Sequence, residues 1–347
     1  MPRAAGSDVP GELEPVVFAL SPESDLGGRV AAAVGVDLSP HPERRFEDGE
    51  HRTRPLVSVR GRDVYVIESL HGGGDLSVND RLCRLLFFCG ALGESSAASV
   101  TAVVPYLCDA RKDRQTKPRD PVTTRYVAMI LEAAGVDRVM ALDVHDLAAF
   151  QNAFRCRTDH LTARLPLARR VAERLAGESF TVVSPDVGDV KRANPFRVAL
   201  TEIVGAPVAS AFAEKRRSGG AVTGDLLTGD LEGRAAVIVD DLISTGGTMT
   251  RTARRCLDLG ATRVLALAAH GVFASGAEQA LADPALEGVL VTGSVELRPL
   301  AGPAGEKLDV VSIAPLLGEA IRRAHTGGSL VELQGSAVAL QDQGAAP

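Results

Sequence analysis

Residues 237–250, VIVDDLISTGGTMT, place two adjacent carboxylates and a glycine-rich turn directly after a run of apolar residues. A buried strand that runs through such a turn into a helix presents backbone N–H groups, to which the helix dipole adds partial positive charge. Residues 244–248 are therefore expected to bind phosphate, whereas Asp240 and Asp241 are expected to meet hydroxyl groups or a metal ion. A sugar phosphate meets both requirements, because it carries a phosphate group and hydroxyl groups. The alternative is that the aspartates merely end a strand and the glycines merely form a turn.

Two other polar segments, LDVHD at 142–146 and SPDVGD at 184–189, follow predicted strands. Open α/β sheets bind ligands at the carboxyl ends of their strands. His145 and Asp186 are candidate Mg²⁺ ligands there, although Mg²⁺ favours oxygen and a lone histidine is more often structural. Asp143 is expected to point the opposite way along its strand and to act as buried support.

Two basic clusters and one acidic turn complete the candidate chemistry. Residues 109–121 contain Arg111, Lys112, Arg114, Lys117 and Arg119, a concentration of cations that suits a polyphosphate. A second cluster at 215–217 opens the glycine-rich segment 214–234, which is expected to be a long mobile loop that brings charge to a transferring phosphoryl group. For both clusters the competing interpretation is a solvated charge run. The turn RFEDGE at 45–50 has no obvious chemistry in isolation.

Short β-branched runs alternate with helical patterns along the chain, which predicts parallel α/β sheets. Helices are expected in SVNDRLCRLLFFCGAL and PVTTRYVAMILEAAG. Strands are expected at residues 15–20, 63–70, 99–106, 137–144, 180–186, 207–212, 235–241, 263–270 and 288–294.

An internal similarity indicates two copies of one α/β unit. GVDRVMALDVH at 135–145 and GATRVLALAAH at 260–270 share Gly, Arg, Val, Ala, Leu and His in register. Helix–Gly–strand passages also look alike by coincidence in α/β proteins. The boundary between the units is expected around residues 154–166, and the tail 335–347 is expected to be frayed.

The composition excludes several protein classes. A chain of 347 residues with 45% apolar residues predicts about two globular domains. The net charge of −6 argues against a general nucleic-acid binder. Five cysteines without a CxxC pair indicate reduced thiols, and no segment approaches 18 consecutive apolar residues. The chain is therefore expected to be cytoplasmic, with no membrane partner.

Six motifs in order make the sequence resemble the ribose-phosphate pyrophosphokinase (phosphoribosyl diphosphate synthetase) family from about residue 15 to about residue 334. These motifs are RFEDGE, VVPYLCDARKDR, RDPVTTRYVAMILEAAGVDRVMALDVHD, VVSPDVGDVKRA, EKRR and VIVDDLISTGGTM. The resemblance implies an α/β fold of two tandem phosphoribosyltransferase-like domains, each a mainly parallel sheet flanked by helices. The domains would be 1–158 on the ATP side and 159–334 on the ribose 5-phosphate side, followed by a flexible tail, 335–347.

The resemblance also implies the reaction, Mg²⁺-dependent transfer of the diphosphoryl group of ATP to the C1 hydroxyl of ribose 5-phosphate with release of AMP. It implies a homo-oligomer, either a dimer or a hexamer built from dimers, whose ATP site is shared between subunits. The implied residues are Lys215 and Arg217 for catalysis; Phe46, Asp48, Gly49, Glu50, Arg111, Lys112 and Asp113 for ATP; Asp240, Asp241, Ser244, Thr245, Gly246, Gly247 and Thr248 for ribose 5-phosphate; and His145 and Asp186 for Mg²⁺.

The chain departs from the common family pattern at Ser244, at Asp189, at the SGG after KRR, and at Cys108, Asp109 and Lys112. These departures leave adenine contacts, loop dynamics and regulation by phosphate or ADP open. A phosphoribosyltransferase would share VIVDDLISTGGT but would not need RFEDGE, ARKDR or a duplicated domain. A catalytically silent regulatory subunit should have lost positions such as Lys215 and His145, which are present. The 45–50 turn could also cap its own domain, with Phe46 as an ordinary core residue.

Overall fold

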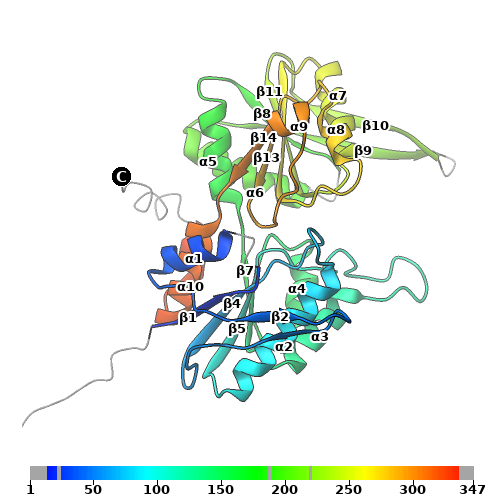
Figure 1. The fold of residues 1–347 in the computed structure, drawn as a ribbon. Coiled ribbons are helices and arrows are strands. Elements are labelled where there is room, and N and C mark those ends of the chain that lie inside the picture. Colours follow the sequence, from blue (N-terminus) through cyan, green and yellow to red (C-terminus); the bar gives the residue numbers. More distant parts are fainter. Residues whose placement is uncertain (1–13, 22–24, 187–189, 219–220, 336–347) are drawn as a thin grey trace, which may run out of the picture.

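The protein is described by a computed structural model over residues 14–21, 25–186, 190–218 and 221–335, and its architecture is built on two mainly parallel sheets (Figure 1). Within these residues the first sheet has the order β1-β4-β5-β6-β7, and every neighbouring pair is parallel. Its strands are β1 (Val16–Ala19), β4 (Asp63–Ile67), β5 (Ser99–Val104), β6 (Arg138–Leu142) and β7 (Arg157–Leu161).

The second sheet has the order β10-β9-β8-β11-β12-β13-β14 and is parallel except at the β9–β10 pair. Its strands are β8 (Phe180–Ser184), β9 (Ala209–Ser218), β10 (Ala221–Gly229), β11 (Ala235–Ile243), β12 (Arg263–Gly271), β13 (Gly288–Thr292) and β14 (Leu308–Val311). The chain leaves β8 toward β9 on one side, while β11 pairs on the other side. The strand order therefore reverses between β8 and β11, which is the point where open α/β sheets bind ligands.

One face of each sheet has its own helical cover. On the first sheet this cover is α2 (Val78–Glu94), α3 (Thr123–Ala133) and α4 (Leu147–Ala153), and on the second it is α7 (Gly247–Asp258), α8 (Ala277–Leu281) and α9 (Gly302–Glu306). Because side chains alternate along a strand, Val17 and Phe18 of β1 enter different cores.

The remaining faces share a single core. It is covered by α1 (Leu26–Val34), α5 (Arg164–Arg174), α6 (Val190–Val204), α10 (Ala314–Thr326) and α11 (Leu330–Gly335). Helix α10 returns to the first unit and packs on α1, where a Cβ on Gly318 would lie 2.5 Å from the Cβ of Ala33 (Figure 1). Only glycine permits so close an approach. The expected domain division at 158/159 falls inside β7, and we propose that the units divide after Leu161 instead.

All nine predicted strands are present, with boundaries shifted by a few residues. Sequence reasoning missed β2 (Glu43–Arg45), β3 (His51–Thr53), β7, β10 and β14 among the described residues. These strands are short, polar or placed in a segment interpreted as a loop. In the segment 214–234, expected to be irregular, β9 and β10 form an antiparallel hairpin because buried partners such as Ala213 and Leu227 extend the sheet. Mobility of this hairpin stays a prediction.

All five cysteines are free thiols. In the part of the chain that the structure describes, no helix combines the length and the apolar character needed to cross a bilayer.

Candidate active site

The carboxyl ends of β6 and β11 meet across the two units. The loop after β6 presents His145, whose Nδ1 lies 2.6 Å from Oδ2 of Asp241 near the end of β11. The Asp241 side chain is 7% exposed, whereas that of His145 is 41% exposed. The structure thus brings a predicted metal ligand and a predicted ribose ligand into direct contact, although they stand 96 residues apart in the sequence.

Arg192 of α6 joins this pair and was not among the residues predicted from the sequence. Its Nη2 lies 3.6 Å from Oδ2 of Asp241 and donates to the backbone oxygen of His145 at 3.3 Å. Arg192 is part of the VKRA stretch after SPDVGD, so the available signal was a cation two residues into a helix that starts at the predicted site.

These contacts fix the charge of the pair. Burial alone would raise the pKa of Asp241, but the hydrogen bond with His145 and the charge of Arg192 outweigh it and hold that pKa well below its ordinary value. The same hydrogen bond raises the pKa of His145 against the opposing effect of burial. Asp241 therefore stays an anion that can accept hydrogen bonds at neutral pH.

The turn after β11 has the backbone geometry of an anion site. Gly246 has φ +76° and caps α7, which begins at Gly247 without an acidic residue in its first turn. The first N–H groups of a helix have no partner within the helix. The turn is held from the other side, because Phe273 N donates to Ile243 O at 3.1 Å and Ala274 N to Ser244 O at 3.0 Å. A phosphate can bind these free N–H groups without rearranging the fold.

The two glycines of this turn should respond differently to alanine. In Gly247→Ala the new Cβ meets the flexible end of Arg251 at 3.4 Å and Thr245 Oγ1 at 3.9 Å, so the fold should persist while the space in front of the N–H groups is reduced. We expect the KM for ribose 5-phosphate to rise about 10–100-fold, the loss of one hydrogen bond to a charged group. Steady-state kinetics at saturating ATP measure this effect.

Gly246→Ala is the matched control. Its positive φ, together with a Cβ only 3.1 Å from that of Ala280, strains the backbone, so it should lower the free energy of unfolding by about 1–3 kcal/mol. Equal KM values for Gly247→Ala and the parent would contradict the phosphate site.

The assignment of His145 and Asp186 as metal ligands stays a prediction. Asp186 follows β8, and its backbone oxygen accepts a 2.6 Å hydrogen bond from Ser184 Oγ, whereas Asp189 lies outside the described residues. Within the described ranges no group of three or more His, Cys, Asp or Glu side chains is arranged to hold a metal ion.

The RFEDGE motif forms the tip of an exposed hairpin made by β2 and β3. Phe46 N donates to Glu50 O at 2.7 Å, and Glu50 N donates to Asp48 Oδ1 at 3.0 Å, while Gly49 has φ +94°. The guanidinium of Arg44 lies 4.8 Å from the centre of the Phe46 ring. Phe46 is thus a partly exposed turn residue rather than a core residue, and the carboxylates of Asp48 and Glu50 face solvent.

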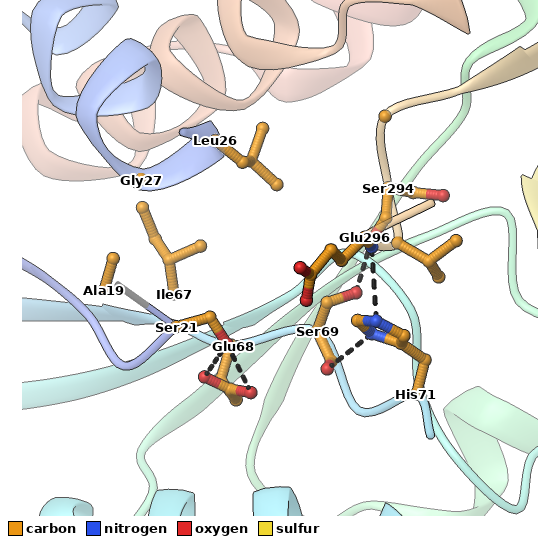
Figure 2. Close-up of a pocket in the computed structure, with 12 residues that line it drawn as sticks. Ala19, Ser21, Leu26, Gly27, Ile67, Glu68, Ser69, His71, Ser294 and Glu296 are labelled. Atoms are coloured by element: carbon orange, nitrogen blue, oxygen red, sulfur yellow. Dashed lines mark hydrogen bonds between the residues drawn. The ribbon is translucent and has the colours of Figure 1, made fainter. Parts of the chain in front are cut away.

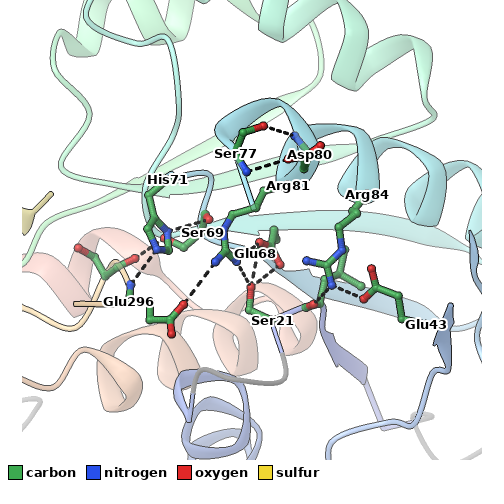
Figure 3. Close-up of polar contacts among 12 residues, drawn as sticks. Ser21, Glu43, Glu68, Ser69, His71, Ser77, Asp80, Arg81, Arg84 and Glu296 are labelled. Atoms are coloured by element: carbon green, nitrogen blue, oxygen red, sulfur yellow. Dashed lines mark hydrogen bonds and ion pairs between the residues drawn. The ribbon is translucent and has the colours of Figure 1, made fainter. Parts of the chain in front are cut away.

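Helix α2 anchors this hairpin. Buried Arg84 donates to Glu43 and to the backbone oxygen of Leu20 (Figure 3), and the ring of His51 stacks on Phe87 with centroids 5.6 Å apart. No hydrogen bond or ion pair within the described residues joins the 46–50 turn to residues 111–113.

The basic segment after β5 is only partly available to a ligand. Lys112 Nζ lies 2.5 Å from Asp120 Oδ2 and 2.9 Å from Thr116 Oγ1, and its hydrogen bond lowers the pKa of Asp120 to about 2. Lys112 is therefore occupied within its own loop. Arg111 is exposed, and the charge of Asp113 contributes to the raised pKa of His145.

Lys215 and Arg217 lie in β9, opposite Asp225 and Val222 of β10. Since β9 pairs with β8, the hairpin belongs to the same sheet as the strand that leads to Asp186 and the strand that carries Asp241.

A second polar contact between the units surrounds a cavity of about 20 Å³, room for roughly one water (Figure 2). Ser69 Oγ donates to Ser294 O, and Glu296 N donates to His71 Nε2 at 3.2 Å. Buried Arg81 contacts Glu68 at 3.0 Å and Glu296 at 3.3 Å (Figure 3). These bonds hold the units together and leave no space for a substrate.

Comparisons with known proteins agree in both halves of the chain. Residues 15–135 match the family profile described as the N-terminal domain of ribose phosphate pyrophosphokinase, and residues 208–334 match the phosphoribosyl synthetase-associated domain. Ribose-phosphate pyrophosphokinase of Aquifex aeolicus is 37% identical over 317 residues, covering 91% of this chain and 98% of the relative. The protein of that name from Gloeobacter violaceus is 38% identical, with 90% and 91% covered.

The fold has a solved counterpart. The crystal structure of phosphoribosylpyrophosphate synthetase from Mycobacterium smegmatis superimposes with a TM-score of 0.81 at 33% sequence identity, covering 91% of this chain and 100% of that chain.

Proposed function

Because the chain belongs to the ribose-phosphate pyrophosphokinase family, we propose that the site between β6, β8 and β11 carries out that family's reaction. The enzyme transfers the diphosphoryl group of ATP to the C1 hydroxyl of ribose 5-phosphate, giving 5-phosphoribosyl 1-diphosphate and AMP. The observation that carries the site is the 2.6 Å contact of His145 with Asp241, which joins the loop of the ATP-side unit to the carboxylates of the ribose-side unit.

On the ribose side, residues 244–248 bind the 5-phosphate through the N–H groups at the start of α7. Asp240 and Asp241 accept hydrogen bonds from ring hydroxyls. Arg192 and His145 keep the Asp241 carboxylate ionised and fixed. The sugar is thereby oriented with C1 toward the loop after β6.

In the transfer, the C1 oxygen bonds to the β phosphorus, the bond from that phosphorus to the α,β-bridging oxygen breaks, and the hydroxyl proton leaves to water. Such reactions depend on positioning and on neutralising charge on the phosphoryl oxygens. Lys215 and Arg217 supply positive charge to these oxygens as the hairpin closes.

Mg²⁺ fits the donor set at this site. The ion typically keeps several waters and binds through one or two carboxylates plus substrate phosphates, so the Asp186 carboxylate would bind it and His145 would orient one of its waters. When bound, it would neutralise charge on the diphosphoryl oxygens.

One assay tests the function directly. Incubation with ribose 5-phosphate, ATP and Mg²⁺ should yield AMP and 5-phosphoribosyl 1-diphosphate in a one-to-one ratio. Formation of ADP without AMP would indicate an ordinary kinase. If neither AMP nor ADP formed, the protein would instead be a regulatory subunit or a phosphoribosyltransferase. Since both substrates are metabolites of the cytoplasm, we place the enzyme there.

For ATP we propose a site shared between subunits. Phe46 packs on the adenine ring, while Asp48 and Glu50 accept hydrogen bonds from its amino group or from the ribose. Arg111 and Asp113 of the neighbouring subunit face the phosphates and their ion, and Lys112 joins them by exchanging Asp120 for a phosphate oxygen. The support is the exposure of the 46–50 turn, which forms no hydrogen bond or ion pair with that segment among the described residues of its own chain.

A shared site predicts complementation in a homo-oligomer. One inactive variant carries Asp48→Ala with Glu50→Ala, and the other carries Lys215→Ala. After subunit exchange, interfaces that join an intact turn to an intact β9 should restore a fraction of the AMP-forming activity. Each variant exchanged with itself is the control. Verified mixed oligomers as inactive as their parents would show that each subunit builds its ATP site alone.

A further inference from the structure

The segment that presents His145 has an unusual backbone conformation. Asp143, two residues earlier, has φ +41°, in the left-handed region that residues with a Cβ seldom adopt. Its carboxylate accepts a 2.8 Å hydrogen bond from Ala163 N, and its own N–H donates to Leu161 O. These contacts come from the end of β7 and the start of α5. Neither contact involves the backbone oxygen of Asp143.

His270 of β12 reaches that oxygen from the other unit. The side chain is 3% exposed, and its Nε2 lies 3.3 Å from the backbone oxygen of Asp143. Its Nδ1 lies 2.8 Å from Ser294 Oγ, and the ring of Tyr106 packs edge-on against it with centroids 5.0 Å apart. A buried histidine thus links three segments that are distant in the sequence.

The chemistry of these partners sets the tautomer of His270. A carbonyl oxygen only accepts, so Nε2 must carry the proton that points to Asp143. Burial lowers the pKa of His270, which favours the neutral ring. In that ring Nδ1 is an acceptor, and the Ser294 hydroxyl donates to it at 2.8 Å in preference to the more distant Ala269 O at 3.2 Å. The backbone oxygen of Ser294 is in turn bonded by Ser69 of the first unit (Figure 2).

We propose that His270 is a positioning residue for the reaction, holding the segment from Asp143 to His145 in the conformation that places the His145 imidazole against Asp241. The inference rests on the proposed function of that site. Arg192 makes the parallel contact at the other end of the segment, to the backbone oxygen of His145. The ribose-side unit therefore fixes both ends of a loop that belongs to the ATP-side unit.

A pair of variants separates the hydrogen bond from the packing. His270→Phe keeps a ring against Tyr106 but leaves the Asp143 oxygen without its donor, whereas His270→Gln retains an N–H donor of similar reach. We expect the phenylalanine variant to lose about tenfold in kcat, with the KM for ribose 5-phosphate changed by less than about threefold. The glutamine variant should recover most of the loss.

Hydrogen exchange supplies a readout independent of activity. Mass spectrometry on the peptide spanning residues 142–147 should show faster amide exchange in His270→Phe than in the parent, and near-parental exchange in His270→Gln. Ser294→Ala, which removes the partner of Nδ1, should show a smaller effect of the same kind. It keeps the test usable if His270→Phe fails to fold.

Thr181→Val is the matched control, because it also removes a buried side-chain hydrogen bond to a backbone oxygen, at 2.5 Å to Asp230, but within one unit. It should lower the Tm without changing kcat or exchange in residues 142–147. A parental kcat in folded His270→Phe would show that His270 is an ordinary core residue without a positioning role. An equal loss of kcat in Thr181→Val would show the same. Absence of AMP formation in the parent would instead overturn the proposed function.

Discussion

Replacing Lys215 with alanine is expected to lower kcat by about 10²–10³-fold, with much smaller changes in both KM values. A charge delivered to the diphosphoryl oxygens as the hairpin closes stabilises the transition state more than the bound substrates, so its removal appears in kcat. Lys215 lies in β9, next to the strand that leads to Asp186, which suits this role. Rapid-quench measurement of AMP formation at saturating substrates gives the value.

Arg216→Ala is the natural comparison, since it removes the adjacent cation of the same strand. We expect its kcat to stay within about threefold of the parent if the position of the charge matters. Equal losses in the two variants would indicate a diffuse effect of positive charge. A near-normal kcat in Lys215→Ala would show that the hairpin does not take part in the reaction through Lys215.

Replacing Asp241 with alanine is expected to lower kcat/KM for ribose 5-phosphate by about 10²–10³-fold. The change would remove the proposed hydrogen bond to a ring hydroxyl and leave both His145 and Arg192 without their carboxylate, and a lost hydrogen bond to a charged group is worth about 1.5–3 kcal/mol. Asp240→Ala should also weaken use of the sugar, by about 10-fold or more. ATP affinity, measured by calorimetry without the sugar, should change far less.

Asp309→Asn controls for the loss of a partly buried carboxylate. Asp309 of β14 contacts Arg170 at 2.8 Å and Arg174 at 3.5 Å, away from the carboxyl ends of β8 and β11. It should reduce stability alone. If Asp241→Ala changed only the affinity for ATP, the ribose site would have to lie elsewhere.

The sequence by itself determined the elements whose signals are local. The strand before Asp240, the glycine that takes a positive φ at position 246 and the start of α7 are all encoded within residues 237–250. The nine apolar strands were equally readable, because a buried parallel strand needs a continuous apolar run. The order of the motifs was enough to indicate the family.

Other features depended on which segments pack together. The polar strand β7 and the hairpin of β9 and β10 form because neighbouring strands supply their hydrogen bonds, which residue type does not reveal. The shared core under α1 and α10 joins segments nearly 300 residues apart, so no local sequence pattern predicts it.

The site shows the same division most clearly. Sequence supplied His145 and Asp241 separately, but their contact, the arrival of Arg192 from α6 and the support of Asp143 by His270 exist only once the two sheets face each other. Hydrogen bonds and ion pairs act over a few ångströms in space, while sequence patterns report the neighbours of a residue along the chain. Tertiary structure therefore decided which of the candidate residues act on one another.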